Sequence, residues 1–134
     1  MAFIEWSDAL SVGFQEVDKD HKELVEIVNR LEEVVTGGAD PDLLKRVFDE
    51  LLSYTQWHFN HEQRLMQNYG YPDLFVHKEE HDDLVKQALG LHEKFQGGDA
   101  SVPQALLPFL KEWLTDHILG TDKKMGEYLA QNAG

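Results

Sequence analysis

The sequence contains no cysteine, and this absence removes whole classes of site. Disulfide bonds, iron–sulfur clusters and zinc sites with thiolate ligands are all excluded. The chain also lacks an apolar run of about twenty residues, which a membrane-spanning helix would need. Its first residues show no charged leader followed by a long apolar stretch, so we expect no secretory signal, no membrane span and a cytoplasmic location.

Basic residues are also scarce, because 12 Lys and Arg stand against 25 Asp and Glu, which gives a net charge of −13. They are scattered along the chain, whereas binding to a nucleic-acid backbone requires clustered Lys and Arg. The 134 residues, 42% of them hydrophobic, suffice for one packed core. We therefore expect a single domain over residues 1–134, monomeric, with an acidic surface that keeps it soluble.

Glycine-containing breaks divide the chain into amphipathic segments. They lie near residues 37–41, 70–73, 97–101 and 120–121. Between the breaks, apolar side chains recur every three or four residues, which is typical of α-helices with one buried face. This spacing predicts helices over about 19–36, 41–69, 74–96 and 102–119, and a short last helix over 123–130.

The short connections favour an all-α fold, an antiparallel up-down four-helix bundle over residues 18–130. Asp18 is expected to cap the first helix. Pro108 lies past the first turn of the fourth helix, so it predicts a kink or a later start there. Residues 1–17 are expected to form an N-terminal arm that packs across the bundle through its apolar residues: Phe3, Ile4, Trp6, Val12 and Phe14.

Histidines and acids lie on the helix faces that must turn inward. His58 and Glu62 are four residues apart, so they stack on one face of their helix. His77 and His81 repeat this spacing. His21 lies near the start of its helix, and His117 lies near the end of its helix. In an up-down bundle, both positions are at the same end as these two pairs. Buried imidazoles and carboxylates are costly unless they are satisfied, and metal coordination is a common way to satisfy them.

Asp122 needs a separate argument as a ligand, because it follows His117 by five residues. In an unbroken α-helix that offset points it about 140° away from His117. We expect Gly120 and Thr121 to break the helix and turn Asp122 inward. The alternative is an ordinary acid in the first turn of the last helix.

Two further histidines are expected outside the ligand set. His92 lies fifteen residues beyond His77, which is roughly 22 Å along the helix axis. We expect it at the surface or the edge of the core. Around the helix axis, His61 points nearly at a right angle to Glu62, so it lies beside the buried face of the helix. This position predicts an outer partner of the site or a solvent-facing residue.

The number of candidate ligands predicts two metal ions. Two octahedral ions offer about twelve positions. Five imidazoles, two bridging carboxylates and one bridging water-derived oxygen would leave about one position open for an external ligand. The Glu-x-x-His motif of carboxylate-rich di-iron bundles is missing. A histidine-rich set favours iron that binds oxygen reversibly over iron that cleaves it. The expected ligands are His21, His58, Glu62, His77, His81, His117 and Asp122.

These motifs resemble the hemerythrin family, specifically the single-domain bacteriohemerythrins, over about residues 4–129. The resemblance rests on His58-Phe59 followed by Glu62 and Met66, on the His77-x-x-x-His81 pair, and on one closing motif. That motif is Trp113-Leu114-x-x-His117-Ile118-x-x-x-Asp122. Two departures are visible, because family members often have Gln where this chain has Asp20, and two acids where it has Glu62-Gln63.

The resemblance implies a single hemerythrin-like domain that binds dioxygen reversibly at two non-haem iron ions (Fe2+/Fe3+) with a bridging oxo or hydroxo group. His77, His81 and His117 would hold one iron, and His21 and His58 the other, whose last position stays open. Glu62 and Asp122 would bridge the two. An oxygen pocket would be lined by Trp113, Leu114 and Ile118.

We therefore expect an oxygen carrier or store, not an enzyme, with dioxygen as ligand and an oxygen-consuming enzyme as a candidate recipient. Two alternatives remain open. One is a di-iron enzyme that acts on peroxide or nitric oxide, and the other is an oxygen sensor.

Overall fold

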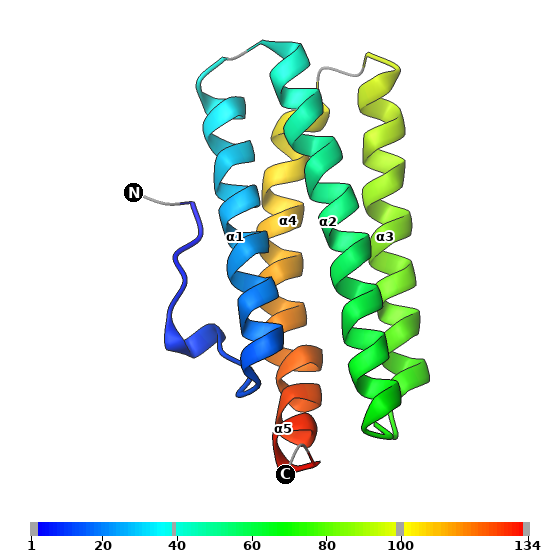
Figure 1. Cartoon of the computed structure of the whole chain (residues 1–134). Coiled ribbons are helices and arrows are strands. Elements are labelled where there is room, and N and C mark those ends of the chain that lie inside the picture. The colour runs from blue at the N-terminus through cyan, green and yellow to red at the C-terminus, as the bar shows by residue number, and fades with distance from the viewer. Residues whose placement is uncertain (1–2, 39, 99–100, 133–134) are drawn as a thin grey trace.

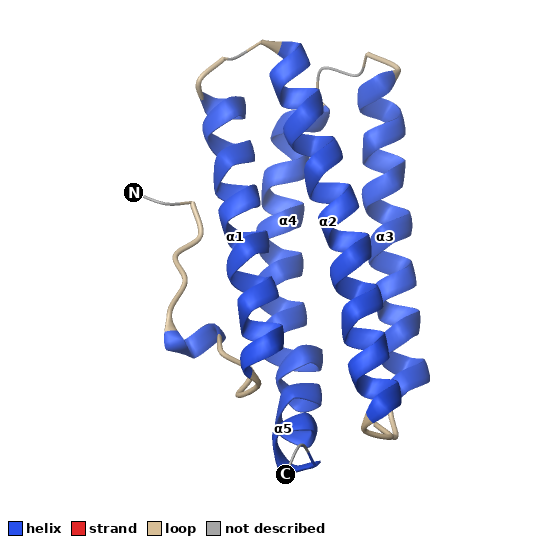
Figure 2. Cartoon of the chain, in the orientation of Figure 1, coloured by secondary structure: helices blue, strands red, loops and turns tan. Residues whose placement is uncertain are grey.

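Four long helices form the body of the protein. The computed structural model describes residues 3–38, 40–98 and 101–132. The helices are α1 (Gln15–Thr36), α2 (Pro41–Asn68), α3 (Leu74–Gln96) and α4 (Val102–His117). They lie side by side and each runs opposite to the next (Figure 1), and the described residues contain no strand (Figure 2). The expected antiparallel up-down bundle is confirmed.

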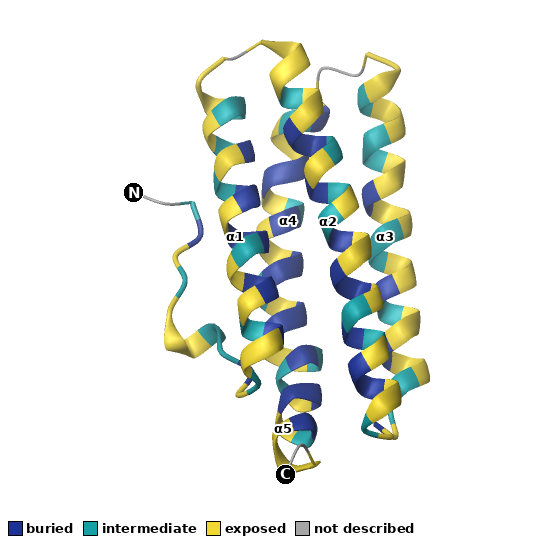
Figure 3. Cartoon of the chain, in the orientation of Figure 1, coloured by how far each residue is buried: buried dark blue, intermediate teal, exposed yellow. Residues whose placement is uncertain are grey.

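The helices pack as a closed ring, because α1 contacts α2, α2 contacts α3, α3 contacts α4, and α4 contacts α1. Their buried positions face inward (Figure 3). Leu31, Phe48 and Leu106 belong to an apolar core in which each is 1% exposed or less. Burial of such side chains stabilises the fold by about 1.5–3 kcal/mol each. Within the described ranges, no helix is long and apolar enough to cross a membrane.

Local capping chemistry accounts for the start of α2, whereas the capping prediction for α1 is corrected. Asp40 caps α2 by accepting a hydrogen bond from the Asp42 backbone N–H at 3.0 Å, and Pro41 occupies the first helical position. The prediction that Asp18 caps the first helix is wrong, because α1 begins at Gln15. The Asp18 carboxylate instead accepts from the Val12 backbone N–H at 2.8 Å and so holds the chain that enters the helix.

The expected N-terminal arm lies beside α1 (Figure 1), with Ile4 and Val12 buried in the core, and contains a short 3-10 turn, η1 (Asp8–Leu10). It ends at Phe14 and not at residue 17, because α1 begins at Gln15. Residues 1 and 2 of the expected arm lie outside the described residues. The Ile4 backbone N–H donates to Asn29 Oδ1 at 2.8 Å, and Asn29 Nδ2 donates back to the Ile4 carbonyl at 2.9 Å. Two reciprocal bonds therefore fasten the arm to α1.

The end of the bundle contains one wide helical turn that the sequence pattern did not predict. The chain passes from α4 through a π-helical turn, η2 (Ile118–Asp122), directly into α5 (Lys123–Asn132). The expected break at Gly120 and Thr121 is therefore wrong, because the helix widens without ending. Of the two alternatives expected at Pro108, the later start is wrong, since α4 begins at Val102 and continues through the proline, and the kink stays a prediction.

Candidate metal centre

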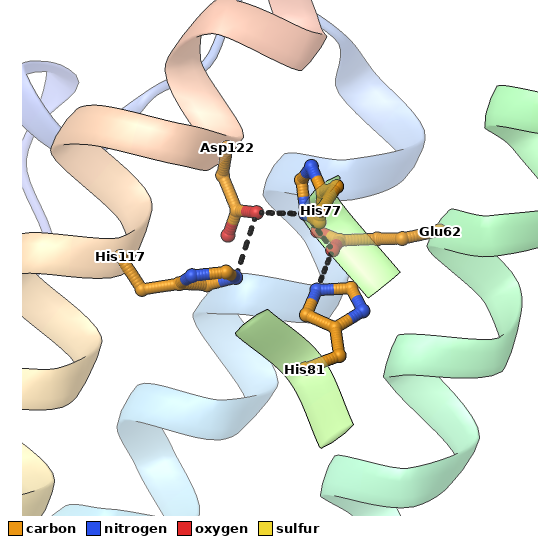
Figure 4. A group of neighbouring side chains, drawn as sticks. All are labelled: Glu62, His77, His81, His117 and Asp122. Carbon is orange, nitrogen blue, oxygen red and sulfur yellow. Dashed lines mark ion pairs between the residues drawn. The ribbon is translucent and has the colours of Figure 1, made fainter. Parts of the chain in front are cut away.

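Five buried side chains from α2, α3, α4 and η2 meet at one end of the bundle. They are Glu62, His77, His81, His117 and Asp122, and their donor atoms all lie within 4.8 Å of one another (Figure 4). Asp122 Oδ1 lies 3.0 Å from both His77 Nε2 and His117 Nε2. Glu62 Oε1 lies 3.0 Å from His81 Nε2. We refer to these residues as the five-residue group.

A second group adjoins the first and shares its two carboxylates. It consists of His21, His58, Glu62 and Asp122, again within 4.8 Å and all buried. Glu62 Oε2 lies 3.2 Å from His21 Nε2 and 3.0 Å from His58 Nε2. Asp122 Oδ2 lies 3.1 Å from His21 Nε2. We refer to it as the four-residue group.

Each shared carboxylate presents a different oxygen to each group. Glu62 offers Oε1 to His77 and His81, and Oε2 to His21 and His58. Asp122 divides its oxygens in the same way. This arrangement suits a carboxylate that bridges two cations.

Local helix geometry brings these side chains together. His77 and His81 lie one turn apart on α3, with ring centroids 4.4 Å apart. The π turn does the same for His117 and Asp122, because residues five apart are one turn apart in a π-helix. Asp122 therefore faces inward, as expected, although through a wider turn and not through a break.

Many buried polar atoms of the centre have no hydrogen-bond partner. Among the described residues, these buried atoms include Nε2 of His58, His77, His81 and His117, and oxygens of Glu62 and Asp122. Such atoms cost roughly 1–3 kcal/mol each when they are left unsatisfied. The centre has imidazole and carboxylate donors that converge on shared points, so it fits metal cations that would satisfy these atoms together.

Electrostatics within the site favour ionised carboxylates. Burial alone would raise the pKa of Glu62, but the His58 charge and the close imidazole nitrogens of His21 and His77 hold that pKa well below its usual value. Burial would lower the pKa of His58, yet Glu62 and Asp20 raise it to about 10. Asp122 and Glu80 raise the pKa of His117, also against burial, to about 10. The metal-free site therefore holds protons that a cation would displace.

Outer contacts orient some of the candidate ligands. His117 Nδ1 donates to Glu80 Oε1 at 2.6 Å, and the Thr121 hydroxyl donates to the same carboxylate at 2.8–2.9 Å. The aromatic ring of Phe59 stacks on His81 with centroids 3.8 Å apart and planes 4° apart. Neither Glu80 nor Thr121 was predicted from the sequence as an outer partner of the ligands. Spacing along the chain predicts neither contact, because Glu80 lies on α3, His117 on α4 and Thr121 in η2.

His92 and His61 lie outside the ligand groups, as expected. His92 is outside both groups and bonds to Asp49 Oδ1 at 2.6 Å. His61 is also outside them, and its Nδ1 lies 2.6 Å from Asp20 Oδ2. His61 is therefore an outer partner of the site, one of the two roles expected for it.

Three apolar residues expected beside the site are buried on α4 and η2. Leu114 is 3% exposed and precedes His117 by three residues, so it lies on the same helix face. Ile118 and Trp113 are 2% and 8% exposed. The Trp113 ring packs edge-on against Phe59 at 5.8 Å, and Phe59 in turn covers His81.

Known proteins match this chain along most of its length. The sequence pattern of the Hemerythrin HHE cation binding domain matches residues 12–129. Bacteriohemerythrin of Methylococcus capsulatus is 37% identical over 97% of this chain and 99% of its own length. Bacteriohemerythrin of Stenotrophomonas maltophilia is 32% identical over 92% of this chain and 79% of its own length. A crystal structure of wild-type hemerythrin superposes with a TM-score of 0.90 at 34% identity, covering 96% of this chain and 99% of that one.

Proposed function

The chain belongs to the hemerythrin family, and from that premise we propose that it binds dioxygen reversibly at a pair of non-haem iron ions. The observation that carries the proposal is the division of Glu62 and Asp122 between two buried histidine groups. A single cation could not use both oxygens of both acids and all the surrounding imidazoles.

In this proposal, His77, His81 and His117 hold one iron, and His21 and His58 hold the other. Glu62 and Asp122 would each give one oxygen to each iron, and the two ions would share an oxo or hydroxo group. When bound, the iron pair supplies the electrons and the open coordination position that reversible dioxygen binding requires. The open position belongs to the four-residue group, which offers one protein ligand fewer than the five-residue group.

The apolar residues near the centre keep water away from it. Leu114 and Ile118 are almost fully buried, and Trp113 closes the side toward Phe59. An apolar lining excludes the protons and water that would otherwise hasten irreversible loss of the oxygenated state. We assign these three residues to the oxygen pocket.

We propose that the protein acts as a carrier or store of dioxygen and not as an enzyme that turns over a substrate. The test is to purify the protein, count iron per chain, and follow its visible spectrum while oxygen is removed and restored. Two irons per chain and a spectrum that returns through several cycles support the proposal. A chain that holds no iron, or whose spectrum does not return, contradicts it.

Turnover assays separate the alternatives. An enzyme would consume peroxide or nitric oxide catalytically, with many equivalents lost per iron pair, whereas a carrier would react with about one dioxygen per pair. The cytoplasmic location, the monomeric state and delivery to an oxygen-consuming enzyme stay predictions. Size-exclusion chromatography of the loaded protein tests the monomeric state.

A further inference from the structure

Asp20 is a buried carboxylate next to the metal centre but outside both ligand groups. It lies on α1 and is 6% exposed. Its Oδ2 atom is 2.9 Å from His58 Nδ1 and 2.6 Å from His61 Nδ1. Burial of a carboxylate costs several kcal/mol unless hydrogen-bond donors compensate for the lost water. Two imidazole N–H groups provide that compensation here.

We propose that Asp20 is a positioning residue for His58, which it holds with Nδ1 protonated and Nε2 directed at the metal. The proposal rests on the proposed function only in taking His58 as an iron ligand. A carboxylate can only accept from Nδ1, so the proton of the neutral imidazole must reside on Nδ1. The nitrogen that faces the centre is Nε2, which lies 3.0 Å from Glu62 Oε2.

The charge of Asp20 also acts on the metal through the imidazole. A carboxylate that accepts from the far nitrogen of a ligating histidine makes that ligand more basic. A more basic ligand stabilises ferric over ferrous iron. His21, the other histidine of the four-residue group, has no hydrogen-bond partner at Nδ1 among the described residues. Asp20 is thus the carboxylate that makes a histidine of the four-residue group more basic. In the proposed function, this group holds the iron with the open coordination position.

His61 keeps the Asp20 carboxylate in place from the solvent side. Its side chain is 22% exposed, and its Nε2 lies 3.6 Å from Glu16 Oε2. The Trp57 ring packs against it with centroids 5.2 Å apart. Asp20 is therefore held between a ligand on the inside and a half-buried imidazole on the outside, so its orientation toward His58 does not depend on water.

The test compares Asp20→Asn with Asp49→Asn in the full-length, iron-loaded protein. Asparagine preserves the shape of Asp20 but removes its charge. Asp49 bonds to His92 at 2.6 Å in the same chemical manner, and His92 lies outside the metal groups. Two quantities are measured without oxygen: the ferrous-iron affinity, by competition with a chelator, and the midpoint potential of the iron pair.

We expect Asp20→Asn to weaken iron affinity about 10- to 100-fold, the range for loss of an outer partner. We also expect the ferric/ferrous equilibrium to shift about tenfold toward ferrous, which raises a one-electron midpoint potential by about 59 mV. Asp49→Asn should match the wild type. Wild-type affinity and potential in a folded Asp20→Asn variant would overturn the inference. A purely structural role would change stability without changing the potential.

A second neutral variant guards against misfolding. Asp20→Gln carries a longer amide that can extend toward the half-exposed His61, and it should raise the potential in the same direction. If neither variant changes the potential, the inference fails while reversible oxygen binding by the wild type still stands. If the wild type binds iron but not oxygen, the proposed function fails, whereas a raised potential in Asp20→Asn still supports the role of Asp20. A wild type that binds no iron overturns both.

Discussion

Removal of His77 tests the metal centre most directly, because this residue contacts both shared acids. His77 Nε2 lies 3.0 Å from Asp122 Oδ1 and 3.4 Å from Glu62 Oε1. His77→Ala leaves the five-residue group with two imidazoles in place of three. We expect the iron affinity of this group to fall by about 100-fold or more, which corresponds to roughly 2.8 kcal/mol.

The loss of iron affinity should reduce the rise in Tm on adding iron, because a ligand that binds the folded state stabilises it. At a free ferrous concentration of about 100 times the wild-type Kd, binding stabilises the folded state by about 2.7 kcal/mol. At the same concentration, a variant with a 100-fold weaker site gains only about 0.4 kcal/mol. For a chain of this size, about 4 °C per kcal/mol is expected, so the metal-induced rise in Tm should be roughly 10 °C smaller in His77→Ala.

The assay measures Tm under anaerobic conditions with and without ferrous iron, and counts iron per chain after desalting. Each variant is compared with its own metal-free form, so the cavity left by the lost ring does not enter the result. His92→Ala is the matched control, since His92 is likewise paired with a carboxylate but lies outside the centre. If His77→Ala retains the wild-type iron content and the full rise in Tm, the ligand assignment is refuted.

Three further outcomes are expected. In the metal-free protein, Glu62 and Asp20 raise the pKa of His58 to about 10 against burial, so this contribution to stability is complete below about pH 6.5 and is lost as pH rises toward 10. Urea unfolding across that range should show a falling free energy of unfolding, and a rising one would contradict the assignment. Leu114→Ala should cost about 2–5 kcal/mol and keep both irons, but speed autoxidation by admitting water; an unchanged decay of the oxygenated spectrum would remove its gating role. Gly126→Ala would bring a Cβ within 2.1 Å of the Val12 carbonyl oxygen and should destabilise by about 1–3 kcal/mol. In Gly90→Ala the new Cβ has no atom within 4 Å, so the substitution should stabilise the folded state by about 0.5–1 kcal/mol. Equal Tm shifts for Gly126→Ala and Gly90→Ala would contradict this contrast.

Much of the fold and of the ligand cluster follows from spacing along the chain. His58 and Glu62, like His77 and His81, share a helix face because they are four residues apart. The glycine-containing breaks predicted the helix boundaries to within a few residues, except at the start of α1 and at η2. At η2 the expected break in the helix was wrong, because the chain continues there as a π turn, which changes which residues share a face.

The sequence by itself therefore determined the bundle, the helix faces and the residues that gather at one end, since these depend on periodicity within single helices. Only the tertiary structure decided which oxygen of each acid faces which group, and which outer partners the histidines have. Asp20 and His58 are 38 residues apart, and Glu80 and His117 are 37 apart. Such contacts depend on the height, rotation and rotamers of two packed helices together, and no spacing within one helix encodes them.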